Sequence, residues 1–238
     1  MPTQIGWCFV NTEGTAAFPS PEKLHLGKDP SPTKRGYLSC PAVRASSQGY
    51  FVIKSPFSLH IRFKRKDDVV SFVPVYPFTT VNEMKLKELF RLEPRDLWRS
   101  IDVPLIQIPS PYFFIADEPI DVEQCPPIFA DTTSMNWRTL SGRFNIHGWQ
   151  RPLNWAFEWD TKCGDLIIKI GEPLYYVRFY DEEGKLILNP DLLQMPLTEE
   201  LRGRLNSTAG VTAIQRGTAS LIRKSSENRS GNLLKVNK

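Results

Sequence analysis

Alternation of hydrophobic and polar residues is the clearest pattern in this chain, and it is strongest between residues 57 and 75. In Phe57–Lys64 every second residue is apolar, which is the period of a strand buried on one face only. Asp68–Val75 has a similar β-rich composition, and Lys66, Asp67 and Asp68 between the two stretches suit a tight turn. The pattern therefore predicts a β-hairpin.

Strands are predicted most densely between residues 136 and 188. Five stretches there have the composition of strands: Asn136–Asn145, Leu153–Asp160, Leu166–Lys169, Pro173–Tyr180 and Lys185–Leu188. Further strands are predicted at Gln4–Val10, after Tyr50, and on both sides of a Ser-Pro turn within Pro104–Ala116. The acidic, proline-bearing stretch Asp117–Thr133 is predicted to be a loop.

Helical spacing of apolar residues is confined to short segments. Thr80–Phe90 is the best candidate in the body of the chain, and Asn82 can cap it. Thr198–Leu205 predicts a second short helix that Thr198 caps, with two glutamates in its first turn. Both segments are short enough to be accessories to a β-rich fold.

Proline content strengthens the β assignment. The chain has 238 residues, of which 20 are proline, and proline inside a helix costs about 3 kcal/mol. The fold class predicted is mainly β, a sandwich with one or two short helices. Residues 1–196 are expected to form a single β-rich domain, and residues 197–238 a short helix followed by a mobile basic tail.

Charge is distributed unevenly along the chain. Residues 197–238 hold eight basic and three acidic side chains, a net +5, whereas the other 196 residues have a net charge of −1. A nearly neutral body argues against nucleic-acid binding except through the basic tail. No apolar run approaches the roughly 18 residues of a membrane span, and the first residues do not resemble a signal peptide, so a cytoplasmic location is expected.

Motifs that would identify an enzyme are missing from the sequence. The three histidines are far apart, and neither a nucleophile elbow nor a phosphate-binding loop is present. The four cysteines occur singly, which predicts free, mostly buried thiols and no metal site. The sequence therefore predicts no cofactor and favours a protein that is not an enzyme.

Aromatic residues mark one strand of the dense region. Trp155, Phe157 and Trp159 alternate and so share one face, which is either part of a sandwich core or a stacking platform for a base or sugar. The sequence favours the core. Glu158 then lies on the opposite face.

Four arginines also fall within this region: Arg138, Arg143, Arg151 and Arg178. Arginines that a sheet brings together can bind an anion through paired hydrogen bonds. The interpretation we favour is that they pair with local acidic side chains.

The string Ser141–Tyr180 resembles the C-terminal half of the dUTPase and dCTP deaminase superfamily, the β-clip nucleotide enzymes. Gly142–Trp149 is similar to the glycine-containing turn of that family, and the strand after it carries Glu158. The resemblance implies a β-clip-like barrel as an alternative fold, a trimer as an alternative assembly, and a nucleotide as ligand. Where the dUTPases carry an aspartate, this chain has Asn145.

The same resemblance implies a set of candidate site residues. Glu158, with His147 nearby, is the candidate catalytic pair. The candidate ligand-binding residues are Asn145, Trp149, Arg143 and Arg178.

A second resemblance spans more of the chain. The blocks Cys40–Arg44, Phe51–Phe57 and Ser141–Phe179 follow one another in the same order as in a family of tailed-phage proteins that carries no assigned activity. It implies a phage or bacterial setting.

Three functions follow from these patterns. The first is a phage-encoded β-rich binding protein whose partner is a protein or a small ligand, a nucleotide being one candidate. The alternatives are a divergent nucleotide hydrolase or deaminase of β-clip fold and a virion-associated structural protein.

Overall fold

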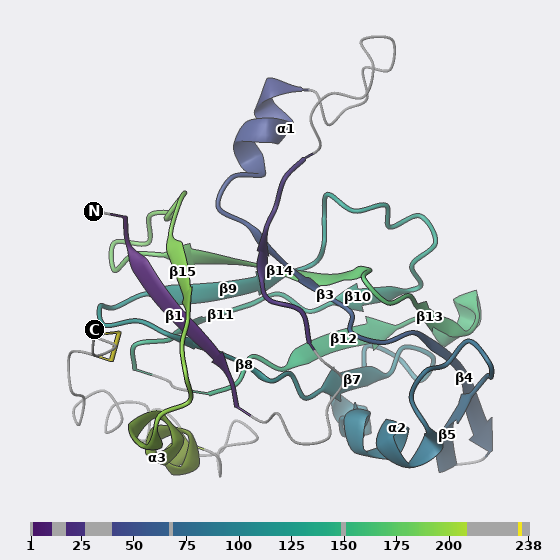
Figure 1. Ribbon diagram of the computed structural model, residues 1–238. Helices are drawn as coiled ribbons and strands as arrows, with labels where there is room; N and C mark the ends of the chain where they lie inside the picture. Colours follow the sequence, from purple (N-terminus) through teal and green to yellow (C-terminus); the bar gives the residue numbers. More distant parts are fainter. Residues whose placement is uncertain are drawn as a thin grey trace.

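A computed structural model describes residues 2–10, 18–26, 40–66, 69–148, 151–208 and 233–234, and most of its regular structure is β-strand (Figure 1). The strands form four sheets that share one large hydrophobic core. None of the sheets in these residues closes into a barrel, and the architecture is a β-rich sandwich with short helices. The predicted fold class is therefore confirmed, in its sandwich form.

The largest sheet has five antiparallel strands in the order β11-β9-β14-β3-β2. Its strands are β2 (Glu22–Lys23), β3 (Phe51–Lys54), β9 (Asp121–Cys125), β11 (Gly142–Asn145) and β14 (Pro173–Tyr180). The central strand β14 has the bounds that the sequence predicts. Val177 and Phe179 on its inner face are fully buried, so this sheet forms one wall of the core.

A second sheet has four strands in the order β10-β12-β7-β6. Its strands are β6 (Arg91–Leu92), β7 (Leu105–Ile108), β10 (Trp137–Thr139) and β12 (Trp155–Trp159). Trp155, Phe157 and Trp159 of β12 are at most 1% exposed. The aromatic face of this strand is therefore core, as predicted, and the stacking platform is excluded because no base or sugar can reach it.

Two three-stranded sheets complete the sandwich. One has the order β13-β4-β5, with β4 (Leu59–Lys66), β5 (Val69–Pro74) and β13 (Leu166–Ile168). The pairing of β4 with β5 confirms the predicted hairpin; Asp67 and Asp68 of its turn lie outside the described residues. The other has the order β15-β1-β8, with β1 (Gln4–Phe9), β8 (Tyr112–Ile115) and β15 (Asp191–Gln194).

The structure corrects the sequence prediction in three places. The predicted loop Asp117–Thr133 contains β9, which has a neighbour on both sides in the five-stranded sheet. The predicted strand Asn136–Asn145 is two strands, β10 and β11, in different sheets. The predicted strand Lys185–Leu188 makes only an isolated bridge, and β15, which follows it, pairs with β1 in parallel. For β9 and β15 a partner strand comes from a distant part of the chain.

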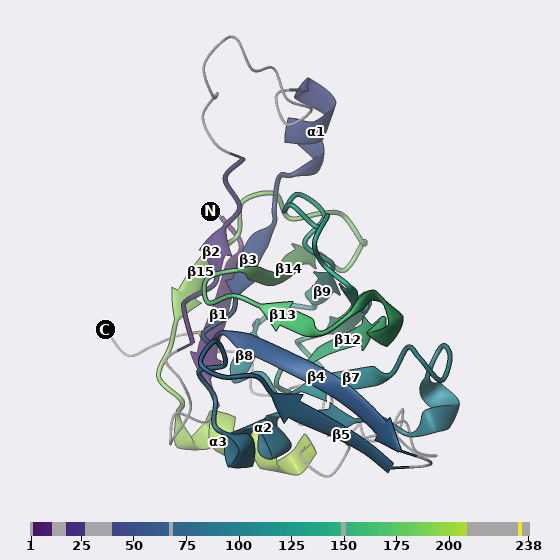
Figure 2. The ribbon, with the colours of Figure 1, turned by 90° about the vertical axis from the view of Figure 1, so that its right-hand side faces the viewer.

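Helices are short and lie at the margins of the sandwich. They are α1 (Pro41–Ser46), α2 (Glu83–Leu89) and α3 (Glu199–Thr208), with 3-10 turns η2 (Arg95–Leu97) and η3 (Thr161–Cys163). The predicted cap of α2 is confirmed, because the side chain of Asn82 accepts a hydrogen bond from the Lys85 amide at 2.8 Å. In both ribbon views α1 projects away from the sheets, and none of its residues is buried (Figure 2).

Several sequence predictions concern residues whose structure is not described. Trp149 is one of them, and so is the predicted mobile tail, apart from Leu233 and Leu234. The prediction of free thiols is confirmed for all four cysteines, but the prediction that most of them are buried is not. Cys8 and Cys125 are buried, whereas Cys40 and Cys163 are exposed.

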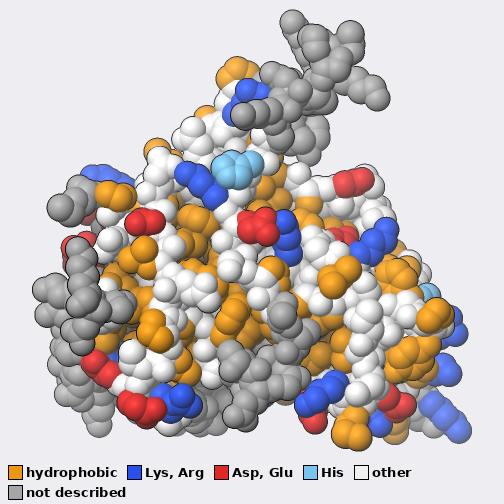
Figure 3. All heavy atoms as spheres, viewed as in Figure 1, with side chains coloured by type: hydrophobic (Ala, Val, Ile, Leu, Met, Phe, Trp, Pro, Cys, Tyr) orange, Lys and Arg blue, Asp and Glu red, His pale blue; other side chains and the backbone are white. Residues whose placement is uncertain are grey.

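Charged side chains of both signs are interspersed on the face that Figure 3 shows. Lys and Arg gather at its lower right, over the β4–β5 hairpin. Arg62, Lys64 and Lys66 of β4 are exposed.

Candidate functional site

Three of the predicted ligand-binding residues lie on the outer face of the five-stranded sheet. Arg178 of β14 donates from Nε to Oε2 of Glu123 at 2.5 Å, and the Tyr180 hydroxyl donates to the same oxygen at 2.6 Å. Burial by itself would raise the pKa of Glu123, but the hydrogen bonds from Arg178 and Tyr180 and the arginine charges hold it below its usual value. Arg178 is therefore fixed by an ionised carboxylate.

Arg143 and Asn145 of β11 are fixed in the same manner by Asp121. Arg143 Nε donates to Asp121 Oδ2 at 2.8 Å, and Asn145 Nδ2 donates to Oδ1 at 2.9 Å. The guanidinium of Arg143 also lies 4.0 Å from the ring centroid of Tyr180. Asn145 Oδ1 accepts from the Gly148 amide at 2.8 Å, so both ends of this carboxamide are used within the protein.

Glu158 lies on a different sheet from these residues. Arg99 Nε donates to its two carboxylate oxygens at 3.0 and 3.2 Å, and Arg138 Nη2 donates to Oε2 at 2.7 Å. Burial would raise the pKa of Glu158, but the two arginines lower it. Arg99 and Arg138 hold Glu158, whereas the predicted residues of the outer face pair with Asp121 and Glu123. Glu158 and those outer-face residues therefore do not form one site.

These contacts favour the simpler interpretation of the arginines. Arg138, Arg143 and Arg178 each form an ion pair with an acidic side chain of a neighbouring strand. The fourth, Arg151, lies elsewhere, at a pocket beside the edge of the five-stranded sheet. Within the described ranges no three His, Cys, Asp or Glu side chains are grouped so that they could hold a metal ion.

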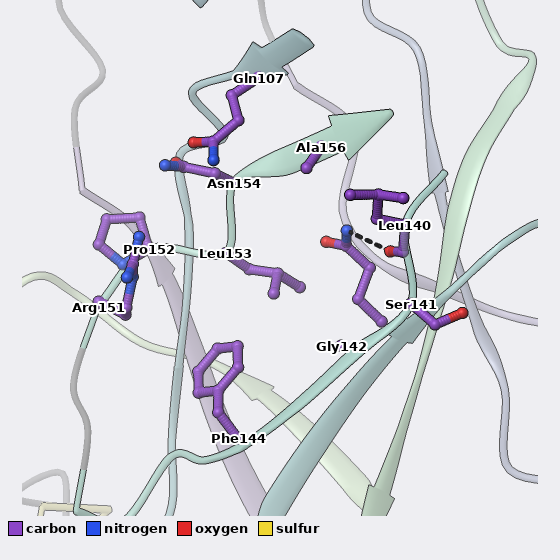
Figure 4. Close-up of a pocket in the computed structure, with 11 residues that line it drawn as sticks. Gln107, Leu140, Ser141, Gly142, Phe144, Arg151, Pro152, Leu153, Asn154 and Ala156 are labelled. Atoms are coloured by element: carbon purple, nitrogen blue, oxygen red, sulfur yellow. Dashed lines mark hydrogen bonds between the residues drawn. The ribbon is translucent and has the colours of Figure 1, made fainter. Parts of the chain in front are cut away.

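That pocket lies between the inner face of β9 and β11 and the polar face of β7 and β12, and has a volume of about 190 Å³ (Figure 4). It is lined by Gln107, Gln124, Leu140, Ser141, Gly142, Phe144, Arg151, Pro152, Leu153, Asn154 and Ala156. Pockets that hold drug-sized ligands measure roughly 300–1,000 Å³, so this one suits a molecule with a single ring or a short chain.

Gln124 of β9 is the most informative residue in the pocket wall. It is only 5% exposed, and its Nε2 donates a long hydrogen bond of 3.4 Å to the carbonyl oxygen of Leu140, drawn as a dashed line in Figure 4. Its Oε1 is buried without a hydrogen-bond partner in the described structure. A buried acceptor left without a donor costs about 1–3 kcal/mol, so such a group in a pocket wall indicates that something else supplies the donor.

Two further carboxamides lie close together on the opposite wall, as Figure 4 shows for Gln107 and Asn154. Asn154 Oδ1 accepts a long hydrogen bond from the Ser110 amide at 3.4 Å, and its Nδ2 has no partner among the described residues. The Gln107 carboxamide makes no hydrogen bond with the described part of the chain. Each carboxamide offers both a donor and an acceptor, so the pocket presents hydrogen-bonding groups from two sides.

Apart from Ser141 and Gly142, the remaining lining residues are apolar or basic. Phe144 and Leu153 supply an aromatic ring and an aliphatic side chain, and the guanidinium of Arg151 stands at the same wall as Pro152 (Figure 4). Burial lowers the pKa of Arg151. None of the eleven lining residues is acidic, and the pocket therefore favours neutral or anionic molecules over cations.

Few of these residues belong to a pattern that the sequence makes visible. Gln124 lies in the stretch predicted to be a loop, and no motif contains Gln107. The signal that was available is the alternation in Asp121–Cys125, where Val122 and Gln124 share the face opposite to the acidic residues. Read as a strand, that segment places a glutamine in the interior.

Comparison with known proteins gives no family: no protein-family model matches the chain, and no curated protein matches it either. Among the described residues, no helix is both long enough and apolar enough to cross a membrane.

Proposed function

We propose that this chain is a binding protein that takes a small polar ligand in the pocket between β9–β11 and β7–β12. The observation that carries the proposal is Gln124 Oε1, a buried acceptor with no donor from the described part of the protein, in the wall of that pocket. A ligand N–H or O–H would satisfy it. Gln107 and Asn154, on the opposite wall, would hold the other side of the same molecule.

The lining residues define the ligand by its chemistry. It carries donors and acceptors on more than one edge, because the pocket offers three carboxamides. It has a flat or apolar side for Phe144 and Leu153, and it is neutral or anionic because the lining contains Arg151 and no acid. A nucleobase and a monosaccharide both meet these requirements, and so does a small carboxylic acid with a ring.

Binding without turnover is favoured over the enzyme alternative because of Glu158. A general base works best when its pKa is near the operating pH, whereas two arginines hold the pKa of Glu158 below its usual value. Glu158 and His147 are also absent from the pocket lining. We propose the following biological context for this binding protein. It is encoded by a tailed phage, works in the cytoplasm of the infected cell and forms a homo-oligomer.

Thermal shift of the purified protein is the first test. The panel contains nucleobases and deoxynucleotides, neutral monosaccharides, sugar acids and small cyclic carboxylates. A ligand at 100 times its dissociation constant adds about 2.7 kcal/mol, which is several degrees for a protein of this size. We expect at least one compound class to raise the melting temperature.

Pocket variants then locate the ligand. In Gln124→Met and Asn154→Leu the ligand should no longer raise the melting temperature. Gln48→Met changes an exposed glutamine outside the pocket and should keep the ligand-induced rise. A shift that survives in both pocket variants would place the ligand elsewhere, and a flat response to the whole panel would turn the search towards a protein partner.

A further inference from the structure

The outer face of β1 and β8 is an apolar surface whose residues are not among those that line the ligand pocket. Cys8 is paired in register with Phe113, and Gly6 with Ile115. Cys8, Phe113 and Ile115 are each at most 2% exposed and form a hydrophobic cluster of their own. Because these buried side chains lie on the outer face of a sheet, residues from outside the sheet must cover them.

Helix α3 provides part of that cover. Leu201 is 1% exposed and belongs to the same cluster, and Leu197 and Leu205 pack against it. The helix lies beside the lower end of β1 in Figure 1, and its cap is the Thr198 hydroxyl, which accepts from the Leu201 amide at 3.3 Å.

Leu233 and Leu234 provide a further part of the cover. Leu233 is 8% exposed and is the fifth buried member of the cluster. A Cβ atom built on Gly6 would lie 2.5 Å from Met195 Sδ and 2.6 Å from Leu234 Cδ2, so Met195 and Leu234 together occupy the space that a side chain at position 6 would fill. The two leucines, the yellow segment beside β1 in Figure 1, are 25 residues beyond the end of α3 in sequence.

Asp117 fixes the backbone of the same two residues. Its Oδ1 accepts from the Leu233 amide at 2.7 Å, and its Oδ2 accepts from the Leu234 amide at 3.2 Å. One carboxylate thus accepts hydrogen bonds from two consecutive backbone amides. This geometry requires an extended or turning backbone, and it fixes the position of the dipeptide. Side-chain burial and this backbone clamp are independent contacts, and both act on the same dipeptide.

We propose that Gly6, Cys8, Phe113, Ile115 and Asp117 form a peptide-docking groove, and that its occupant is the Leu233–Leu234 segment of the same chain. The segment is held by side-chain burial and two hydrogen bonds, so it can leave the groove without unfolding the sheets. Because the docking is intramolecular, a free peptide of the same sequence competes against a high local concentration. The groove is thus an interaction surface for a Leu-Leu peptide, and a segment of the same chain occupies it.

The reactivity of the Cys8 thiol measures whether the groove is covered, and the reactivity of Cys125 in the same protein is the internal control. Burial raises the pKa of both thiols to about 11, but Cys125 belongs to a different cluster, with Tyr50 and Tyr176. In the full chain, Leu233→Asp should increase the rate at which a disulfide reagent modifies Cys8 by tenfold or more, with peptide mapping to separate the four thiols. The rate at Cys125 should stay unchanged. Leu97→Asp, at a leucine that is 56% exposed, should leave both rates as they are.

A synthetic peptide of residues 229–238 completes the test. Added to the Leu233→Asp protein, it should restore the protection of Cys8, whereas the same peptide with aspartate at position 233 should not. Asp117→Asn, which keeps one acceptor oxygen and removes the charge, should speed amide exchange at Leu233 and Leu234.

Three outcomes would overturn the proposal. An unchanged Cys8 rate in Leu233→Asp would show that the leucines do not cover the groove. A parallel rise at Cys125 would show general loosening of the fold instead of release of one segment. Protection of Cys8 that depends on protein concentration would assign the docked segment to a second copy.

Discussion

The two faces of strands β9 and β11 use polar residues in opposite ways. On the outer face, Asp121 and Glu123 receive hydrogen bonds from Arg143, Asn145, Arg178 and Tyr180, and every one of these groups has a partner. On the inner face, one residue further along β9, Gln124 lines the pocket, and its buried Oε1 has no hydrogen-bond partner in the described structure.

The contrast separates residues that hold the fold together from residues that are available to a ligand. Arginine and asparagine on the outer face look like binding residues in the sequence, but their hydrogen bonds are already made within the protein. Glutamine on the inner face carries no charge and belongs to no motif, yet it keeps an unmet hydrogen bond. Unmet hydrogen bonds in a cavity are therefore a better indicator of function here than residue type.

Glu123→Ala should cause the largest change on the outer face. Removing one partner of a mostly buried pair leaves the Arg178 charge uncompensated, and we expect the free energy of unfolding to fall by about 2–4 kcal/mol. Urea unfolding measures it. Glu183→Ala removes an exposed acid that pairs with Lys185 and should change the stability by less than about 1 kcal/mol. If the free energy of unfolding fell by a similar amount in both variants, the Glu123–Arg178 pair would be no more important for stability than an exposed ion pair.

Asn145→Asp should have the next largest effect. The amide that donates to Asp121 is replaced by a second carboxylate at the same distance, so a hydrogen bond is lost and two like charges face each other. The expected loss is about 1–3 kcal/mol. Asn189→Asp is the matched control, because Lys23 donates to that side chain and tolerates a carboxylate. A stable Asn145→Asp protein would indicate that position 145 is open to a ligand.

Acid should reduce the contribution of Glu123. Its folded-state pKa lies below the unfolded value of about 4.3, so the stability from this pair is present above that pH and is lost as the pH falls through the folded pKa. The difference in unfolding free energy between the wild type and Glu123→Gln should therefore narrow from pH 7 to pH 3. A difference that stays constant over this range would show that Glu123 is not ionised in the folded protein.

Gln124→Met should have the smallest effect on stability, although it removes a buried polar group. Only a 3.4 Å hydrogen bond is lost and an unsatisfied acceptor is removed, so the change is expected to lie within about 1 kcal/mol of zero or to be stabilising. Thermal unfolding without ligand measures it. A loss comparable to that of Glu123→Ala would mean that Gln124 is a structural residue.

Local patterns determined much of the fold. The alternation in Phe57–Lys64 predicts β4, the bounds of β14 follow from composition, and Asn82 caps α2 as expected. In these elements the side chains that face the core recur with the period of the backbone, so neighbouring residues contain the information.

The tertiary structure alone decided β9, β15 and the pocket. Asp121–Cys125 has one strongly apolar residue and looks like a loop until β11 and β14 pair with it on both sides. β15 is a strand because β1, more than 180 residues earlier, lies beside it. Gln107, Gln124 and Asn154 meet because two sheets pack against each other. Sequence periodicity reports which face of a strand is buried, whereas the partner of a strand and the side chains across a cavity depend on contacts between distant residues.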